Sequence, residues 1–163
     1  MNRTALDDHN FGYVCSGMKN ACELRHLEVN HNEITKKGME GFKEHAIKQG
    51  LEELDISNNK IIGGGLNELA YLLGSEYGLT RISKSFKVLK SRGNRIRHSL
   101  FNFFSNISIN QTVEELHLSD NPLGEGSVGA ISSFLSRTFS LKLLDLSHGK
   151  LYTVNILELC NGL

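Results

Sequence analysis

The 163-residue sequence predicts an α/β solenoid in which each unit contributes one short strand and one helix. Two observations lead to this prediction. One pattern of apolar residues, usually closed by an asparagine and a further apolar residue, recurs five times along the chain, and more apolar residues follow each copy at helical spacing. Because a unit of about 28 residues cannot bury its apolar side alone, adjacent units have to stack side by side.

The first half of each unit predicts a strand. The copies start at residues 24, 51, 86, 113 and 141 and read LRHLEVNHNEI, LEELDISNNKI, FKVLKSRGNRI, VEELHLSDNPL and LKLLDLSHGKL. In each copy two apolar positions lie two residues apart, as Leu54 and Ile56 do, so they share one strand face while the residue between them points the other way. Two copies depart from the pattern: Ser91 takes the place of the third apolar residue, and Gly149 that of the asparagine.

The recurring asparagines are expected to have a structural role. Asn32, Asn59, Asn94 and Asn121 fall where the chain turns out of each strand. A buried side-chain amide at such a turn can bond the backbone of neighbouring turns. We therefore predict a ladder of asparagine side chains that runs through the array.

The second half of each unit predicts a helix. The positions eight and twelve residues after the closing apolar residue are Phe42 and Ala46, Leu69 and Leu73, Phe104 and Ser108, Ile131 and Leu135, and Leu159 and Leu163. A step of four residues puts both positions on one helix face. Stacked units of this kind place their strands on a concave face and their helices on a convex face.

The same register predicts the domain organisation. Leu6, Val14 and Met18 fit the closing and helical positions of an earlier unit, and the last helix reaches Leu163. We therefore expect residues 1–163 to form a single array of about five and a half units that either belongs to a longer array or has its ends covered by another surface. The spacing of 35 residues between the second and third copies predicts an insertion of about eight residues beside segment 74–85, on the convex side.

Repeats of this length, with an amphipathic helix in their variable half, resemble leucine-rich repeats of the ribonuclease-inhibitor-like class from Leu6 to Leu163. The segment LHLSDNPLGEGSVGAISSFLSRTFSLKLLDLSHGKL is also similar to the arrays of CARMIL proteins, which regulate actin capping protein. These resemblances imply a leucine-rich repeat solenoid, or horseshoe, and a role in the actin cytoskeleton. In CARMIL proteins the segment that binds capping protein lies outside the array, so that activity is assigned to no residue here.

Composition and charge exclude several classes of protein. Lys+Arg and Asp+Glu both number 18, and a net charge of zero argues against a generic binder of nucleic acid or acidic membranes. The sequence shows neither a long apolar run nor a secretory signal, so we expect a cytoplasmic protein without membrane insertion. Cys15, Cys22 and Cys160 lack paired spacing and predict neither disulfides nor a zinc site.

The local motifs predict no catalytic residue, metal or cofactor. Residues 124–129, GEGSVG, match a dinucleotide-binding pattern, but the repeat register assigns them to a connection from strand to helix. Asp145, Ser147 and His148 have the residue types of a hydrolase triad, yet they are too close in sequence to adopt its geometry. We therefore expect a protein that is not an enzyme.

Two columns of displayed strand residues predict a surface for a folded protein partner of unknown identity. They are Glu28, Asp55, Lys90, His117 and Asp145 in the first column, and Asn30, Ser57, Arg92, Ser119 and Ser147 in the second. Lys90 and Arg92 lie mid-array between acidic units, so we expect them to contribute most to binding an acidic partner.

The sequence leaves open the role of a basic stretch and the possibility of a GTPase-activating function. Seven bases crowd one stretch of the chain without an acid between them, and they either solvate the surface or bind an acidic partner. They are Arg81, Lys84, Lys87, Lys90, Arg92, Arg95 and Arg97. The second question is activity, because a Ran-activating family of GTPase-activating proteins uses the same class of repeat, although no motif here selects that function. The oligomeric state is not predicted.

Overall fold

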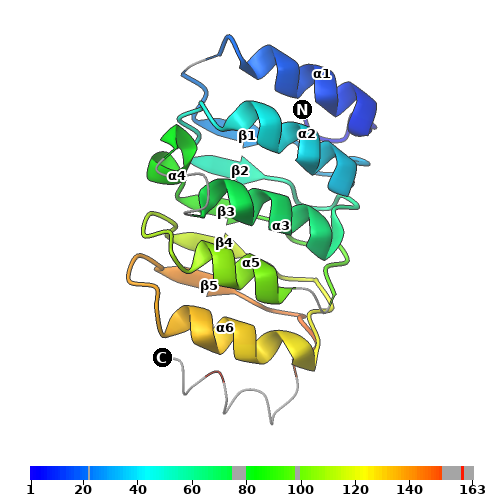
Figure 1. Cartoon of the computed structure of the whole chain (residues 1–163). Coiled ribbons are helices and arrows are strands. Elements are labelled where there is room, and N and C mark those ends of the chain that lie inside the picture. The colour runs from blue at the N-terminus through cyan, green and yellow to red at the C-terminus, as the bar shows by residue number, and fades with distance from the viewer. Residues whose placement is uncertain (22, 75–79, 98–99, 152–158, 160–163) are drawn as a thin grey trace.

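In the computed structural model, which describes residues 1–21, 23–74, 80–97, 100–151 and 159, five strands form one parallel sheet in chain order. The strands are β1 (His26–Glu28), β2 (Glu53–Asp55), β3 (Val88–Lys90), β4 (Glu115–His117) and β5 (Leu143–Asp145). The helices lie in a second layer over one face of this sheet (Figure 1). This arrangement confirms the α/β solenoid.

The helices follow the strands one repeat at a time. They are α1 (Asp8–Met18), α2 (Lys36–Ala46), α3 (Ile62–Leu73), α4 (Arg81–Ser85), α5 (Leu100–Ile107), the 3-10 helix η2 (Glu125–Ser127) and α6 (Val128–Leu135). In the helix layer α1, α2, α3, α5 and α6 pack against one another in this order. The short helix α4 lies in the 35-residue spacing between the second and third copies and packs against α3, while residues 75–79 of the predicted insertion lie outside the described residues.

The core fills the space between the two layers. The central strand residues Leu27, Leu54, Leu89 and Leu116 are buried, as are the helical residues Phe42, Leu69, Phe104 and Ile131. Leu6 and Val14 pack against this core and Met18 is part of it, so α1 occupies the helix position of an earlier unit, as predicted. Leu163 lies outside the described residues. Each fully buried apolar side chain of this size contributes about 1.5 to 3 kcal/mol, and this burial holds the layers together.

The strands pair in strict repeat register. Leu27 pairs with Leu54, Leu54 with Leu89, Leu89 with Leu116 and Leu116 with Leu144. The backbone ladder continues beyond the strands, where the N–H of each exit residue donates to a carbonyl of the next repeat. These donors are Arg3, His31, Asn58, Gly93 and Asp120, with N···O distances of 2.7 to 3.2 Å. Equivalent positions of successive repeats therefore form straight rows across the molecule.

The predicted asparagine ladder is confirmed. The Asn59 amide nitrogen donates to the carbonyls of Val29 and Ile56, each at 3.0 Å, and its side-chain oxygen accepts from the Ile34 N–H at 3.0 Å. Asn94 and Asn121 repeat this pattern one and two units further on. One buried side chain thus satisfies three backbone groups on two repeats, groups that would be costly to bury without partners.

Both ends of the ladder have a clear structure. Asn32 accepts from the N–H groups of Thr4 and Leu6 at 3.1 and 3.0 Å, so the first residues of the chain supply the backbone donors that a preceding repeat supplies elsewhere in the ladder. Within the ladder, the unusual Ser91 is buried, and its hydroxyl accepts from the Asn94 amide at 3.1 Å. At Gly149 the ladder stops, because glycine has no side chain to continue it, and an added Cβ would lie 2.7 Å from the carbonyl oxygen of Leu146.

We expect Asn59→Ala to lower the free energy of unfolding by about 1 to 3 kcal/mol, because buried backbone groups of two repeats lose their partner. Urea unfolding followed by circular dichroism measures this change. Asn58→Gly is the matched control: Asn58 is half-exposed, has φ of 54°, and bonds only the His31 ring through its amide. An unchanged midpoint for Asn59→Ala would contradict the stabilising role of the ladder.

Candidate protein-binding face

The face of the sheet opposite the helices, which we call the sheet face, is the surface predicted to be concave. It carries three rows of side chains across the five repeats. The first row is His26, Glu53, Val88, Glu115 and Leu143; the second is Glu28, Asp55, Lys90, His117 and Asp145; the third is Asn30, Ser57, Arg92, Ser119 and Ser147. The second and third rows are the predicted columns, now confirmed as spatial rows.

Sequence reasoning missed the first row. Each of its residues directly precedes the inward-facing central leucine of its strand, so it points to the same side as the residue that follows this leucine. The strand period of two contains this information, and extending the period backwards by one step would have found the row. The omission matters because the row adds two acids, Glu53 and Glu115, to the sheet face.

Two residues of the third row are not displayed. Ser57 and Ser119 are only 8% and 5% exposed, so the prediction that they are displayed is wrong, although they were predicted to bind the partner. The Ser57 hydroxyl accepts from the Arg92 N–H at 3.2 Å, and the Ser57 N–H donates to the Asp55 carboxylate at 2.9 Å. These bonds hold the serine in the strand-exit turn. The other residues of the two predicted columns are exposed or half-exposed.

The central bases are engaged within the molecule. The Lys90 ammonium pairs with the Glu53 carboxylate, and this hydrogen bond, followed by the charges of Asp55 and Glu28, raises the pKa of Lys90. The Arg92 guanidinium pairs with the Asp120 carboxylate. Neither base is therefore a free anchor for an acidic partner, contrary to the sequence-based expectation for this pair.

With the first row included, the sheet face is acidic. Its first two rows contain five acids and one base: Glu28, Glu53, Asp55, Glu115 and Asp145 against Lys90. The hydrogen bond from Lys90 holds the pKa of Glu53 below its ordinary value, and hydrogen bonds from Ser147 do the same for Asp145. His26 and His117 lie 3.2 and 3.0 Å from Glu53 and Glu115. The face therefore presents net negative charge at neutral pH.

A fourth row, at the edge where the strands begin, alternates in charge. It consists of Arg25, Glu52, Lys87, Glu114 and Lys142. Arg25 lies 2.6 Å from Glu52, Lys87 lies 3.3 Å from the same carboxylate, and Lys142 lies 2.6 Å from Glu114. Hydrogen bonds from these bases lower the pKa values of both glutamates. Much of the basic stretch seen in the sequence is thus neutralised by acids of neighbouring repeats.

The described residues contain no group of three or more His, Cys, Asp or Glu side chains that could hold a metal ion. Burial raises the pKa of the Cys15 thiol to about 12, so this thiol is protonated at neutral pH and a poor nucleophile. The GEGSVG segment forms η2 and the start of α6, as the repeat register predicts. No helix in the described part of the chain is long and apolar enough to cross a membrane.

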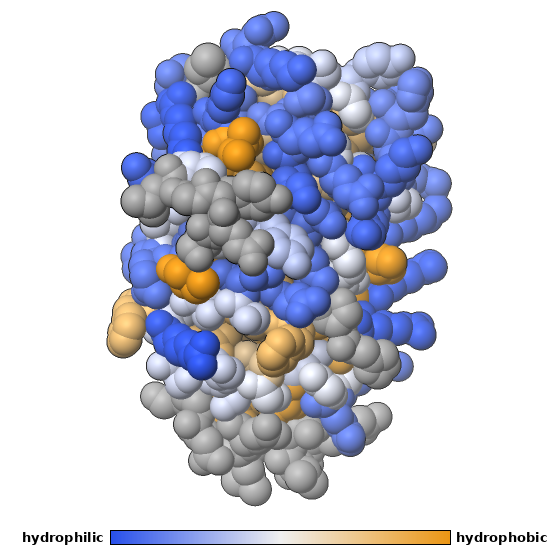
Figure 2. Space-filling model, in the orientation of Figure 1, coloured by the Kyte–Doolittle hydropathy of each residue, from blue (hydrophilic) through white to orange (hydrophobic). Residues whose placement is uncertain are grey.

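The helix layer has a different surface. Figure 2 views this layer and shows mostly hydrophilic side chains near α1 and α2, with paler and apolar ones toward α5 and α6. A shallow groove of about 280 Å³ runs between the last two helices, lined by Phe101, Phe104, Ala130 and Phe134 among others. The sheet face, in contrast, carries polar side chains at the regular spacing of the repeats.

Comparison with known proteins agrees with this geometry. Residues 21–43 and 110–132 match one leucine-rich repeat model and residues 50–72 match another. The chain contains leucine-rich repeats and has their fold. No match to a curated protein was found.

Two solved structures share this leucine-rich repeat fold. One is leiomodin-1 actin-binding site 2, with a TM-score of 0.70 and 18% identity over 93% of this chain and 88% of that chain. The other is the tropomodulin C-terminal domain of Caenorhabditis elegans, with a TM-score of 0.70 and 14% identity over 93% and 90%. Neither is a CARMIL array, so that narrower resemblance rests on the residues quoted above.

The charge rows predict how stability depends on pH. The folded-state pKa values of Glu52, Glu53, Glu114 and Asp145 are lowered, so their stabilising effect is full above the unfolded-state pKa and is lost as pH falls through the folded-state values. We expect the thermal midpoint to fall as pH drops from about 6 to about 3.

The variant Lys90→Gln measures how much the ion pair between Lys90 and Glu53 contributes to this pH dependence. We expect the variant to lower the midpoint at pH 6 by about 1 to 3 °C, since a partly exposed pair contributes about 0.3 to 1 kcal/mol. The difference from the parent chain should be smaller at pH 3 than at pH 6, because the charge on Glu53 is lost as pH falls through its lowered folded-state pKa. A difference that stays the same at both pH values would show that Lys90 stabilises the fold through packing instead of charge.

Proposed function

We propose that this chain is a non-enzymatic protein-binding module whose sheet face holds a folded partner. The observation that carries the proposal is the exposed array of polar side chains on five strands in register, presented by the rigid two-layer scaffold. Extended faces of repeat solenoids are suited to binding because their spacing is fixed by the stack. The displayed members of the array are Glu28, Asn30, Asp55, Lys90, Arg92, His117, Asp145 and Ser147, with Glu53 and Glu115 from the row before them.

The negative charge of the sheet face favours a partner with a basic surface. Acids outnumber bases, and the central base Lys90 is paired with Glu53, so the face attracts a basic surface. Side chains that already hydrogen-bond to neighbours, such as Asp145 to Ser147, lose little conformational freedom when a partner binds. Complementary charge of this kind increases the association rate and sets the orientation of the complex.

Actin is the partner we propose to test first. Support comes from the fold, because the similar structure of leiomodin-1 is described as an actin-binding site and the similarity covers most of both chains. The resemblance of the last two units to CARMIL arrays points to the same cytoskeletal setting. A role in actin regulation also agrees with a cytoplasmic location, which we propose on the same basis.

The test compares actin binding by two double charge reversals. Glu28→Lys with Glu115→Lys changes the sheet face, and Glu40→Lys with Glu44→Lys makes the same change on α2, in the helix layer. Binding to monomeric actin is measured by fluorescence titration and binding to filaments by co-sedimentation. We expect the sheet-face variant to weaken binding about tenfold or more, because attraction is replaced by repulsion, and the helix-layer variant to bind like the parent.

The remaining outcomes separate the parts of the proposal. Equal weakening by both variants would move the binding site off the sheet face. If the parent chain binds neither form of actin, the assignment of actin is wrong, and the sheet face is then tested with a basic probe, polylysine, at low salt. Failure of the parent to bind this probe more tightly than the sheet-face variant would overturn the acidic binding face.

A further inference from the structure

The edge where the strands end has the opposite character to the sheet face. We call it the exit rim and define it as residues 1–7, which lie beside the first exit loop, together with the loops that follow the strands, residues 29–35, 56–61, 91–97, 118–124 and 146–151. Bases outnumber acids here by six to three. The bases are Arg3, Lys60, Arg92, Arg95, Arg97 and Lys150, and the acids are Asp7, Glu33 and Asp120.

The acids of the exit rim are all engaged. Glu33 pairs with Lys60 at 2.9 Å, and Asp120 pairs with Arg92. Asp7 caps the N-terminus of α1, where it accepts from the Asn10 N–H at 2.9 Å. Each of these carboxylates therefore already has a local partner.

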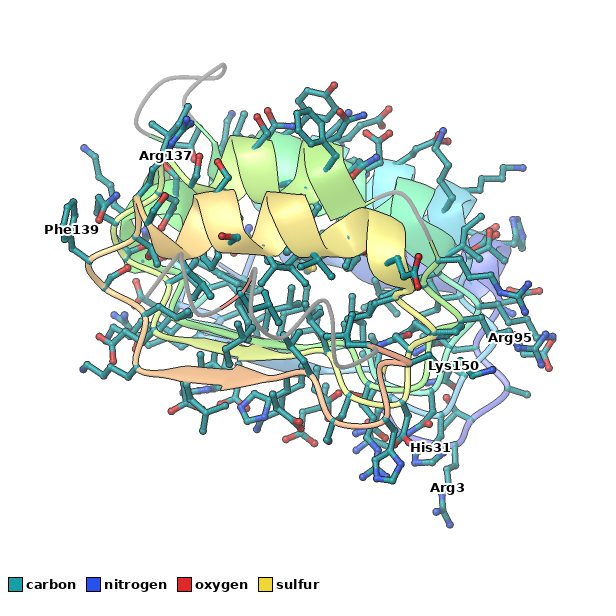
Figure 3. All side chains as sticks on the ribbon, turned by 90° about the horizontal axis from the view of Figure 1, so that it is seen from below. Arg3, His31, Arg95, Arg137, Phe139 and Lys150 are labelled. Atoms are coloured by element: carbon teal, nitrogen blue, oxygen red, sulfur yellow. The ribbon has the colours of Figure 1, made fainter. Side chains whose placement is uncertain are left out.

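Four bases of the rim remain without an acidic partner within 4 Å in the described part of the chain. Arg3, Arg95, Arg97 and Lys150 are all exposed. Figure 3 shows Arg3, Arg95 and Lys150 projecting from the same edge, together with His31, whereas Arg137 and Phe139 lie at the opposite edge. The rim therefore concentrates unpaired positive charge along the length of the stack.

Two further features accompany these bases. An open depression of about 740 Å³ lies between Arg97 and Lys150, lined also by His148, Pro122 and the exposed Glu125. Ile62 is 49% exposed and occupies the place that Arg97 has in the next repeat, and its N–H donates to the Asn94 carbonyl of that repeat. One apolar side chain thus lies beside the unpaired bases.

We infer that the exit rim docks on an anionic lipid surface, with the sheet face left free for a protein partner. The strands are in register, so the exit loops lie side by side along one edge of the stack and carry their unpaired bases at that edge. A negatively charged bilayer attracts such a row of bases, and an exposed isoleucine among them adds contact with the boundary between headgroups and acyl chains.

The character of the rim favours lipid over an acidic protein. Protein interfaces centre on aromatic and well-packed anchors. The described residues of the exit rim include no Phe, Tyr or Trp, and the exposed aromatic side chains Tyr13, Phe101 and Phe139 lie in other parts of the chain. Its unpaired bases are not held in place by neighbouring acids in the described part of the chain. They can therefore adjust to lipid headgroups, which have no fixed positions.

The net charge of zero does not oppose this inference. It averages a basic exit rim with an acidic sheet face, and the range of electrostatic interactions in physiological salt is only about 8 Å. At a membrane the local charge of the nearest edge therefore dominates. The sequence-level argument against acidic membranes holds for a uniform charge distribution, which this fold does not have.

The experiment uses vesicle co-sedimentation with phosphatidylcholine alone and with about 30 mol% phosphatidylserine added. The rim variant is Arg95→Glu, Arg97→Glu and Lys150→Glu. The matched control is Lys48→Glu, Lys84→Glu and Arg137→Glu, which reverses three exposed bases outside the rim and without an acidic partner in the described residues. Circular dichroism checks that all three proteins fold alike.

We expect the parent and the control to bind anionic vesicles and not neutral ones, with affinity falling as salt rises. The rim variant should lose about tenfold or more in affinity, since each base near an anionic surface contributes about fivefold. Ile62→Gln should weaken vesicle binding by a smaller factor. Its binding to polyglutamate, an acidic peptide without lipid, should not change.

Three results would overturn the inference. Failure of the parent chain to bind anionic vesicles at low salt is the first. Equal loss in the rim variant and the control is the second, since it would show a diffuse charge effect. The third is binding to polyglutamate that depends on the rim without binding to vesicles, which would assign the rim to an acidic protein.

Discussion

Strict register between repeats is the constraint on which the rest of this structure depends. A strand of three residues has too few backbone hydrogen bonds to fix its own position, so the register has to be set elsewhere. Asparagine side chains do this at the exit turns: Asn59 bonds the backbone on both sides of a repeat boundary, and Asn94 does so at the next. Apolar burial between the layers supplies most of the stabilisation, and the ladder determines which residues lie opposite one another.

Because the repeats are in register, residues at equivalent positions form rows of side chains across the molecule. Where the position alternates in sign, as from Arg25 to Glu52 to Lys87, each acid lies between two bases and most of the charge in the row is compensated. Where acids recur, as on the sheet face, charge accumulates on one surface. Partly exposed pairs of this kind contribute only about 0 to 1 kcal/mol each, so their main effect is on the potential that a partner meets.

The two charged surfaces are compatible with simultaneous use. The sheet face and the exit rim meet along the strand ends, where the pair between Arg92 and Asp120 lies on the boundary between them. A molecule with a basic edge and an acidic face is oriented in the field of a negatively charged surface, with the acidic face directed away from it. The shared fold with leiomodin and tropomodulin domains establishes the scaffold, and the arrangement of charge is a property of this chain's own residues.

The sequence by itself determined the repeat, the strand and helix of each unit, the asparagine ladder and the columns of displayed residues. These follow from local periodicity, because a strand alternates its faces every residue and a helix repeats about every four. The tertiary structure decided which charges remain free. Lys90 and Arg95 look alike in the sequence, yet Lys90 faces Glu53, 37 residues away, and Arg95 faces no acid in the described part of the chain. The burial of Ser57 and Ser119 was likewise decided by the turn into which the stack folds them. Ion pairing and burial depend on neighbours brought together by stacking, and the periodicity of one repeat contains no information about the charges of the next.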